Sequence, residues 1–260
     1  MYDSLLLDSN AVKEDALVGE PVLNIEHLYK SFGANKVLAD FNLKIAKGEN
    51  VVVLGKSGSG KSVLIKCIIG LLTPDSGSIR MFGSNIPDIK NDVLDKIRAK
   101  VGFLFQSNAL YDSMTVRENL EFPLRRHWIS VTQNEVNDMV QQALEEVGLA
   151  HTIDSMPAEL SGGMRKRIAL ARTLILKPEI ILYDEPTTGL DPITAKEIIN
   201  LMVEIRERYT TTSLIISHDM NCVRLASSRV VMLIEGNCYA NGSFDQLAKN
   251  MDPKVKQFFE

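Results

Sequence analysis

The stretch "VVVLGKSGSGKS", Val51 to Ser62, decides the fold. It joins a continuous apolar run of strand length to a glycine-rich loop, and the helical pattern "KSVLIKCIIGLL" begins at Lys61. A continuous apolar run is typical of a strand that is buried on both faces. A strand, a glycine-rich loop and a helix in this order open a parallel α/β sheet. The sequence therefore predicts an α/β core.

The loop in this stretch has the composition of a phosphate-binding loop. It matches G-x-x-x-x-G-K-[S/T] completely, with Gly55, Lys56, Ser57, Gly58, Ser59, Gly60, Lys61 and Ser62. Glycines let the backbone N–H groups turn toward phosphate oxygens, and the helix N-terminus adds partial positive charge. Lys61 is expected to reach the β- and γ-phosphates of ATP, and Ser62 to give one oxygen to Mg²⁺. A glycine-rich turn without a ligand is the alternative, and the strand-loop-helix context argues against it.

Charged residues follow two further buried-strand patterns, "EIILYDE" and "TSLIISHD". These side chains should emerge where parallel α/β sheets bind ligands, at the carboxyl ends of the strands. Asp184 can hold the hydration shell of Mg²⁺, and Glu185 can polarise an attacking water as general base. His218 can reach the same phosphate. The alternatives are a helix cap or solvated charge for the acidic pair, and a structural role for the histidine.

A second anion site is predicted far along the chain, in "LSGGMRKRIALARTLIL", Leu160 to Leu176. Ser161 is a good N-cap residue, and Gly162 and Gly163 expose backbone N–H groups at the start of a long helix. If this end cannot reach the chain's own nucleotide, a two-fold dimer would let each copy cover the ATP of the other. An ordinary capped helix start is the alternative.

Composition excludes several classes of protein. The 260 residues carry a net charge of -4, and Lys and Arg are scattered apart from "RKR" at Arg165 to Arg167, so nucleic acid is not an expected partner. Cys67, Cys222 and Cys238 are odd in number and widely spaced, which fits reduced thiols in the cytoplasm. The sequence has no apolar run near the length of about 18 residues that crosses a bilayer, so we expect a chain that neither leaves the cell nor spans a membrane by itself.

Taken together, the motifs from about Val22 to Gly242 resemble the ATP-binding-cassette (ABC) ATPases. The resemblance implies a P-loop NTPase fold: a RecA-like core, an N-terminal antiparallel β subdomain and an inserted helical subdomain. The implied organisation is an extension at residues 1–21, an ABC ATPase domain at 22–243 with its helical subdomain at about 107–175, and a short helical tail at 244–260. The sequence patterns agree with these subdomains. Residues 21–50 alternate between apolar and polar as antiparallel strands do, and residues 114–173 contain only helical patterns.

The resemblance also implies roles for individual residues. The signature is Leu160 to Met164, Asp184 binds Mg²⁺ through water, Glu185 is the catalytic base and His218 contacts the γ-phosphate. Gln106 is the glutamine that contacts Mg²⁺ and links the nucleotide to the helical subdomain. Asp191, at the end of "GLD", belongs to the loop that faces the second copy in a head-to-tail dimer sharing two ATP. Phe32 stands where the family stacks an aromatic ring on adenine, with Tyr29 as the alternative.

Finer detail resembles the ATPase subunit of mammalian-cell-entry (MCE) or Mla-type phospholipid transporters. The features are Met164 followed by "RKR", the connector "FQSNALYDSMTV" at Phe105 to Val116, and the tail "DPKVKQFF". Asn108 and Tyr111 depart from the closest family phrase, which has Gly and Phe there. This resemblance implies a peripheral protein on the cytoplasmic side of the inner membrane, with integral membrane permease subunits and an MCE-domain substrate-binding subunit as partners.

Other functions compete with this interpretation. The ATPase of another importer or exporter, for amino acids, ions or lipoproteins, shares most motifs but not the features around Met164 and the connector. A soluble ABC ATPase would often have two cassettes or a coiled-coil insertion, and neither is present. A kinase or small GTPase has no use for the signature. In the connector, Leu110, Tyr111 and Met114 either receive a coupling helix of the permease or pack within the helical subdomain.

Overall fold

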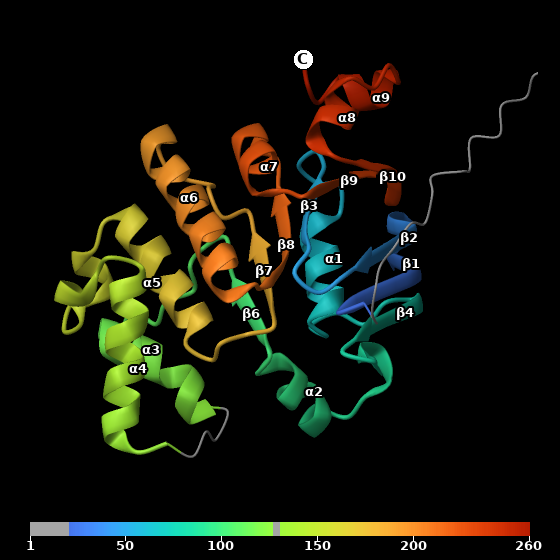
Figure 1. Ribbon diagram of the computed structural model, residues 1–260. Helices are drawn as coiled ribbons and strands as arrows, with labels where there is room; N and C mark the ends of the chain where they lie inside the picture. The colour runs from blue at the N-terminus through green and yellow to red at the C-terminus, as the bar shows by residue number, and fades with distance from the viewer. Residues whose placement is uncertain (1–20, 127–130) are drawn as a thin grey trace, which may run out of the picture.

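The computed structural model describes residues 21–126 and 131–260 (Figure 1). An antiparallel sheet comes first, in the strand order β2-β1-β4-β5. Its strands are β1 (Leu23–Phe32), β2 (Asn35–Ile45), β4 (Ser76–Met81) and β5 (Ser84–Asn85). The alternating pattern of this region therefore forms antiparallel strands, as the sequence predicts. The expected extension at residues 1–21 lies, apart from Pro21, outside the described residues.

The central sheet has the order β10-β9-β3-β8-β7-β6, and the strands from β9 to β6 are parallel. Both of its faces are covered. Val52 and Leu54 of β3 belong to one apolar core, whereas Val51 and Val53 belong to another. This two-sided burial explains the continuous apolar run at these positions. The strands are β3 (Asn50–Leu54), β6 (Val101–Leu104), β7 (Ile180–Asp184), β8 (Thr212–Ser217), β9 (Arg229–Ile234) and β10 (Asn237–Gly242).

Helices cover the two faces of the central sheet. The core on one face includes α1 (Lys61–Ile68), α2 (Asn91–Arg98) and the antiparallel sheet. The core on the other face includes α6 (Pro192–Tyr209) and α7 (Met220–Ala226). A parallel sheet covered by helices on both faces, beside an antiparallel sheet, agrees with the α/β core and the antiparallel strands expected from the sequence.

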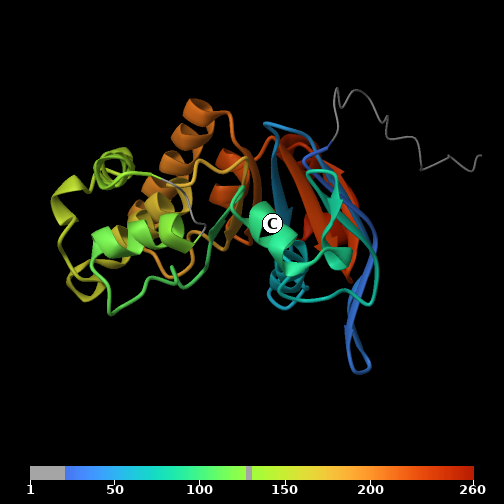
Figure 2. The same cartoon turned by 90° about the horizontal axis from the view of Figure 1, so that it is seen from below.

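A helical region enters the chain between β6 and β7. It contains α3 (Val116–Arg126), α4 (Gln133–Glu146), the short 3₁₀ turns η2 (Ala150–Thr152) and η3 (Pro157–Glu159), and α5 (Gly162–Leu174). Figure 2 shows this region and the antiparallel sheet at opposite ends of the molecule. Local sequence fixes two helix starts, because Thr132 caps α4 with a capping box and the Ser161 hydroxyl accepts from the Met164 N–H.

The C-terminal residues fold back onto the core through α8 (Phe244–Ala248) and α9 (Pro253–Lys256). Val255 is buried, and the rings of Phe244 and Phe259 pack edge to face. The two short helices agree with the expected helical tail. The 3₁₀ turn η1 (Ile86–Asp88) lies between β5 and α2. Within the described residues, we found no helix with both the length and the apolarity that a bilayer span requires.

Candidate active site

The glycine-rich loop runs from the end of β3 to the start of α1, and two glycines are required there by close contacts. Gly60 has φ of 102°, and a Cβ atom at this position would lie 2.8 Å from Val37 Cγ1. A Cβ on Gly55 would lie 2.9 Å from the carbonyl oxygen of Leu233. A larger side chain at either position would push the loop away from its neighbours. The sequence motif therefore reflects a tightly wound loop around an interior position.

Lys61 occupies that interior position. Its ammonium group donates to the carbonyl oxygens of Gly55, at 2.7 Å, and Lys56, at 3.0 Å. It also lies 3.5 Å from Glu185 Oε1, and only 6% of the lysine is exposed. The loop thus surrounds a buried cation, which lies at the point where the sequence predicts contact with phosphate.

The carboxyl ends of β7 and β8 bring Glu185 and His218 to the same place. Glu185 is buried, and its N–H donates to the Ile216 carbonyl of the neighbouring strand at 2.9 Å. Its Oε2 atom lies 2.8 Å from His218 Nδ1. The φ of Glu185 is 47°, a left-handed conformation that is uncommon for a non-glycine residue. The carboxylate is therefore held between Lys61 and His218 by a constrained backbone.

An open cavity of about 330 Å³ joins these groups. This volume lies within the usual range for small-molecule sites, roughly 300–1,000 Å³. Phe32 is among the residues around it, whereas Tyr29 is not, which favours Phe32 as the aromatic residue for adenine. The lining consists of Phe32, Val37, Ser57, Gly58, Gly60, Lys61, Ser62, Val63, Gln106, Glu185 and His218. Val37 and Val63 carry no chemical signal in the sequence that would have placed them here.

Oxygen-bearing side chains at this cavity fit a magnesium ion. Ser62 and Gln106 line it, and Asp184 ends β7 one residue before Glu185. The Oδ1 atom of Asp184 is buried and has no hydrogen-bond partner among the described residues. Burial, and then the neighbouring Glu185 carboxylate, raise the pKa of Asp184. Hydroxyl, amide and carboxylate oxygens are the ligands that Mg²⁺ prefers.

Other residues of the expected site lie elsewhere. The side chains of Lys56 and Ser59 face a different cavity beside the C-terminal segment, where Lys56 Nζ donates to Gln257 Oε1 at 2.8 Å. Asp191 caps α6 by accepting from the N–H groups of Ile193 and Thr194. Ser161, Gly162 and Gly163 begin α5, outside the lining of the cavity at Lys61. The glycine-rich loop therefore lines this cavity, whereas the predicted second anion site, at the N-terminus of α5, does not.

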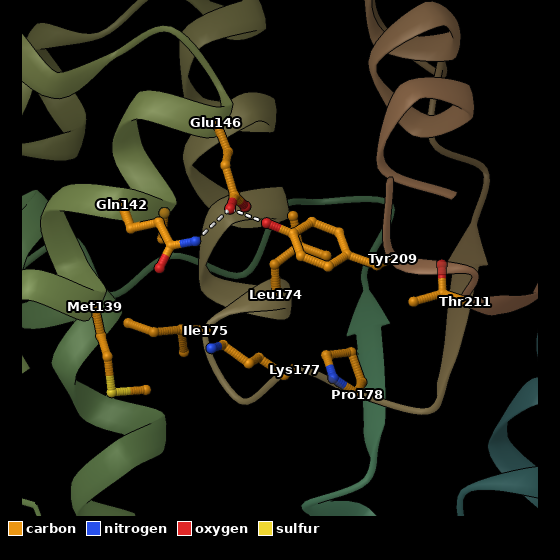
Figure 3. A pocket seen from close by; sticks show the side chains of 10 residues that line it. Met139, Gln142, Glu146, Leu174, Ile175, Lys177, Pro178, Tyr209 and Thr211 are labelled. Carbon is orange, nitrogen blue, oxygen red and sulfur yellow. Dashed lines mark hydrogen bonds between the residues drawn. The ribbon is translucent and has the colours of Figure 1, made fainter. Parts of the chain in front are cut away.

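A further cavity, of about 120 Å³, lies at the other end of the parallel strands (Figure 3). Pro178 and Thr211, which line it, precede β7 and β8, so it lies at the amino ends of these strands. Tyr209 and Gln142 both donate to the Glu146 carboxylate across it (Figure 3). Gln142 and Glu146 both belong to α4, so the Tyr209 contact is the one that connects the end of α6 to α4. The cavity is distant from the glycine-rich loop and does not take part in the phosphate site.

The contacts of the basic residues of α5 are not evident from the sequence. Lys166 and Arg172 direct their side chains onto the backbone of the connector between β6 and α3. In the sequence, "RKR" reads as a small cluster of charge. The only feature of the sequence that bears on the burial of Lys166 is that apolar residues, Ile168 to Leu170, follow it closely in the same helix.

The family model described as ABC transporter matches residues 38–188. A probable ribonucleotide transport ATP-binding protein, mkl, of Mycobacterium leprae is 40% identical over 236 residues, which are 91% of this chain and 68% of that protein. The chain thus spans about two thirds of the length of the mycobacterial relatives that it matches.

A second relative aligns over nearly its whole length. The intermembrane phospholipid transport system ATP-binding protein MlaF of Haemophilus influenzae is 35% identical over 243 residues, covering 94% of this chain and 92% of that protein. Among solved structures, a dimeric ATP-binding cassette in a post-hydrolysis state, bound to ADP and Pi, is similar with a TM-score of 0.77 and 32% identity. The similarity covers 85% of this chain and 98% of the cassette.

Proposed function

The chain belongs to the ABC transporter family and is the ATP-hydrolysing subunit of a transporter. On that premise, we propose that it moves phospholipid between membranes through an MCE/Mla-type complex. The observation that carries the proposal is the similarity to MlaF, a phospholipid transport protein, over 92% of that relative's length. Met164 in the signature and the connector after β6 support the same assignment. Other ABC transport ATPases share the catalytic motifs, so these finer features distinguish the cargo class.

Ribonucleotide transport is the second candidate. It is favoured by the higher identity to mkl, 40%, although the alignment covers only 68% of that protein. The two candidates differ in the chemistry of the cargo: a phospholipid is amphiphilic and partitions into membranes, whereas a ribonucleotide is a water-soluble anion. The two cargoes therefore call for different assays.

We assign the chemistry of ATP hydrolysis to the groups around the 330 Å³ cavity. Backbone N–H groups of the loop and Lys61 bind the phosphates, and Phe32 stacks on the adenine. Glu185 takes the proton of the attacking water, because its carboxylate already lies among the groups that face the γ-phosphate. His218, at 2.8 Å from Glu185, orients that carboxylate and contacts the γ-phosphate.

Ser62, Gln106 and Asp184 would hold Mg²⁺ at the edge of this cavity. When bound, the ion supplies positive charge to the β- and γ-phosphate oxygens. Asp184 would act through water, because it ends β7 and is not among the residues that line the cavity. The ion would also provide the partner that the buried Oδ1 atom of Asp184 lacks among the described residues.

The second phosphate-binding end leads us to propose a head-to-tail dimer that shares two ATP. Ser161 and Gly162 do not line the chain's own nucleotide cavity, and Asp191 caps α6 outside it. The similar ATP-binding cassette is described as dimeric. In such a dimer the N-terminus of α5 covers the ATP held by the other copy, so binding of ATP draws the two copies together.

Transport also requires a path through the membrane. We therefore propose integral permease subunits and an MCE-domain substrate-binding subunit as partners, with this chain bound peripherally to the permease on the cytoplasmic side of the inner membrane. Tyr111 and Phe105 are partly exposed, and their connector leads from β6 into α3 of the helical region, so a permease helix can dock there. Closing and opening of the dimer would then move the permease.

The proposal is tested by purifying the chain with its native membrane partners and reconstituting the complex into vesicles. Mass spectrometry of co-purified molecules should identify phospholipid, and ATP should drive transfer of labelled phospholipid to acceptor vesicles. A complex with Glu185→Gln is the control for dependence on hydrolysis. ATP-driven uptake of labelled ribonucleotide, with no phospholipid transfer, would favour the second candidate and refute the first.

A further inference from the structure

Side chains of α5 hold the backbone of the connector that carries Gln106. Lys166 Nζ donates to the Gln106 carbonyl oxygen at 2.9 Å, and the Phe105 carbonyl oxygen lies 3.4 Å from the same nitrogen. The lysine belongs to α5, which begins at Gly162 after the Ser161 cap, so a single rigid element carries both the signature end and this contact. Gln106 itself is one of the residues that line the nucleotide cavity.

Lys166 is an unusual residue to find in such a position, since it is only 1% exposed. Its acceptors are neutral carbonyl groups, and burial lowers its pKa to about 8, offset in part by the field of Asp184. Taking an ammonium group out of water is costly unless hydrogen bonds offset the loss of hydration. The contacts that offset this cost fix two carbonyl groups of the connector beside the nucleotide cavity.

Arg172 holds the next part of the connector from the other end of α5. Its guanidinium donates to the carbonyl oxygens of Asn108, at 3.0 Å, and Ala109, at 2.8 Å. Both of these residues are left-handed, with φ of 65° and 51°, a conformation that L-residues rarely adopt in succession. The turn directs its carbonyl groups toward α5, and the bidentate contact stabilises that geometry. The connector is thus fixed at several successive peptide groups.

We propose that Lys166 is a positioning residue for ATP hydrolysis, which holds the backbone of Gln106 so that this side chain enters the nucleotide cavity, with Arg172 fixing the following turn. Because the contacts come from α5, Gln106 must move together with the signature end of its own chain. In the proposed dimer, Gln106 of one chain lies at one ATP and the signature of the same chain at the second ATP, so the two would change position as one unit. The inference rests on the proposed role of Gln106 at the metal, and it is independent of the cargo.

The test is Lys166→Met in the full chain, which keeps the length of the side chain and removes the ammonium group. We expect kcat to fall about tenfold and the Mg²⁺ concentration for half-maximal hydrolysis to rise about tenfold, as for other groups that support metal-binding residues. The KM for ATP should change much less, because Lys61 and the loop are unaltered. Lys166→Gln, which restores an N–H donor, should recover most of the lost activity.

Matched variants separate a positioning role from other effects. Lys249→Met removes an exposed lysine at the end of α8, in the C-terminal segment, and should leave kcat and the Mg²⁺ dependence unchanged. Gln106→Ala tests the underlying assignment, because a wild-type Mg²⁺ dependence in that variant would refute the role of Gln106 itself. If Gln106→Ala shows the shift and folded Lys166→Met has wild-type kcat and Mg²⁺ dependence, the positioning role of Lys166 is refuted.

A variant near the C-terminal end of α5 keeps the proposal testable if Lys166→Met does not fold. Arg172→Met removes the contacts to Asn108 and Ala109 and should shift kcat and the Mg²⁺ dependence in the same direction, by a smaller factor. A lower melting temperature with both kinetic quantities unchanged would show that the contacts only stabilise the fold, which overturns the inference.

Discussion

Replacing Gly162 with leucine tests whether the N-terminus of α5 serves the ATP of another copy. Gly162 is the first residue of this helix, directly after the Ser161 cap. A Cβ at Gly162 would meet Leu190 Cδ2 at 3.9 Å, an ordinary contact, so the chain itself leaves room for a side chain. Gly163 differs, since a Cβ there would lie 2.6 Å from Thr194 Cγ2. The perturbation at Gly162 is therefore directed outward.

The expected magnitudes follow from this geometry. Within one chain, glycine to leucine in a helix gains at most about 1 kcal/mol of helix propensity, so the free energy of unfolding should stay equal or rise slightly. Nucleotide affinity of the monomer should be unchanged, because Gly162 does not line the cavity that contains Lys61. In the dimer the leucine would occupy the space through which phosphate approaches the N–H groups. Loss of such preorganised donors reduces turnover by about 100-fold to 1,000-fold.

Three measurements decide the outcome. Fluorescent-nucleotide titration gives the affinity of the dilute monomer, phosphate release gives turnover, and size exclusion in ATP gives dimerisation in a Glu185→Gln background. Gly162→Ala is the smaller control and should retain more turnover than Gly162→Leu. Gly163→Ala should instead lower the melting temperature through its contact with Thr194. Wild-type turnover by a folded Gly162→Leu protein would refute the shared site.

The remaining predictions concern the base, the connector and the thiols. Glu185→Gln should retain ATP binding and an ATP-dependent dimer but lose about 100-fold to 10,000-fold in turnover, and an ordinary ATPase rate would contradict the base assignment. Tyr111→Ala should weaken transport or permease binding, measured in the reconstituted complex, with nucleotide affinity of the free chain intact; unchanged transport would exclude a docking role. Burial raises the pKa of Cys67 to about 11 and of Cys222 to about 12, so at pH 8 about 0.1% or less of each thiol should be thiolate. Both should react with a disulfide reagent only in denaturant, and rapid reaction of the native protein would show that they are accessible.

The parallel core could be predicted because its signals are local. Each of β3, β7 and β8 is a continuous apolar run, and these runs exist because alternate residues enter different cores: Val52 and Ile181 on one face, and Val51 and Ile180 on the other. The strand order could not be predicted. β3 pairs with β8 and β9, more than 150 residues later in the chain, and no property of the separate segments specifies which of them become neighbours.

The residues of the site also fall into those whose place could be predicted from the sequence and those whose place could not. Glu185 and His218 follow buried strands, so their common location can be derived from the rule that parallel strands end at one edge. The direction of Lys56 and Ser59 could not, because it depends on the C-terminal segment packing behind the loop. The burial of Lys166 was equally hidden, since its acceptor at Gln106 lies 60 residues earlier. Composition shows the charge of a side chain but not the partner that removes it from water.

The connector owes its shape to polar residues outside it. Asn119 of α3 is fully buried, and its amide nitrogen donates to the carbonyl oxygens of Tyr111, Met114 and Thr115, at 3.0 to 3.1 Å. Its Oδ1 atom accepts from the Tyr111 N–H at 2.8 Å. An amide with all of these contacts orders the loop without using the loop's own apolar side chains. Tyr111 can therefore remain 42% exposed on a fixed backbone, as a docking residue requires. Asn119→Leu would leave the Tyr111 N–H and the Met114 carbonyl oxygen without their partner, each at about 1–3 kcal/mol, whereas the Tyr111 and Thr115 carbonyl oxygens would keep a backbone donor. The substitution should therefore loosen the connector while the nucleotide cavity stays formed.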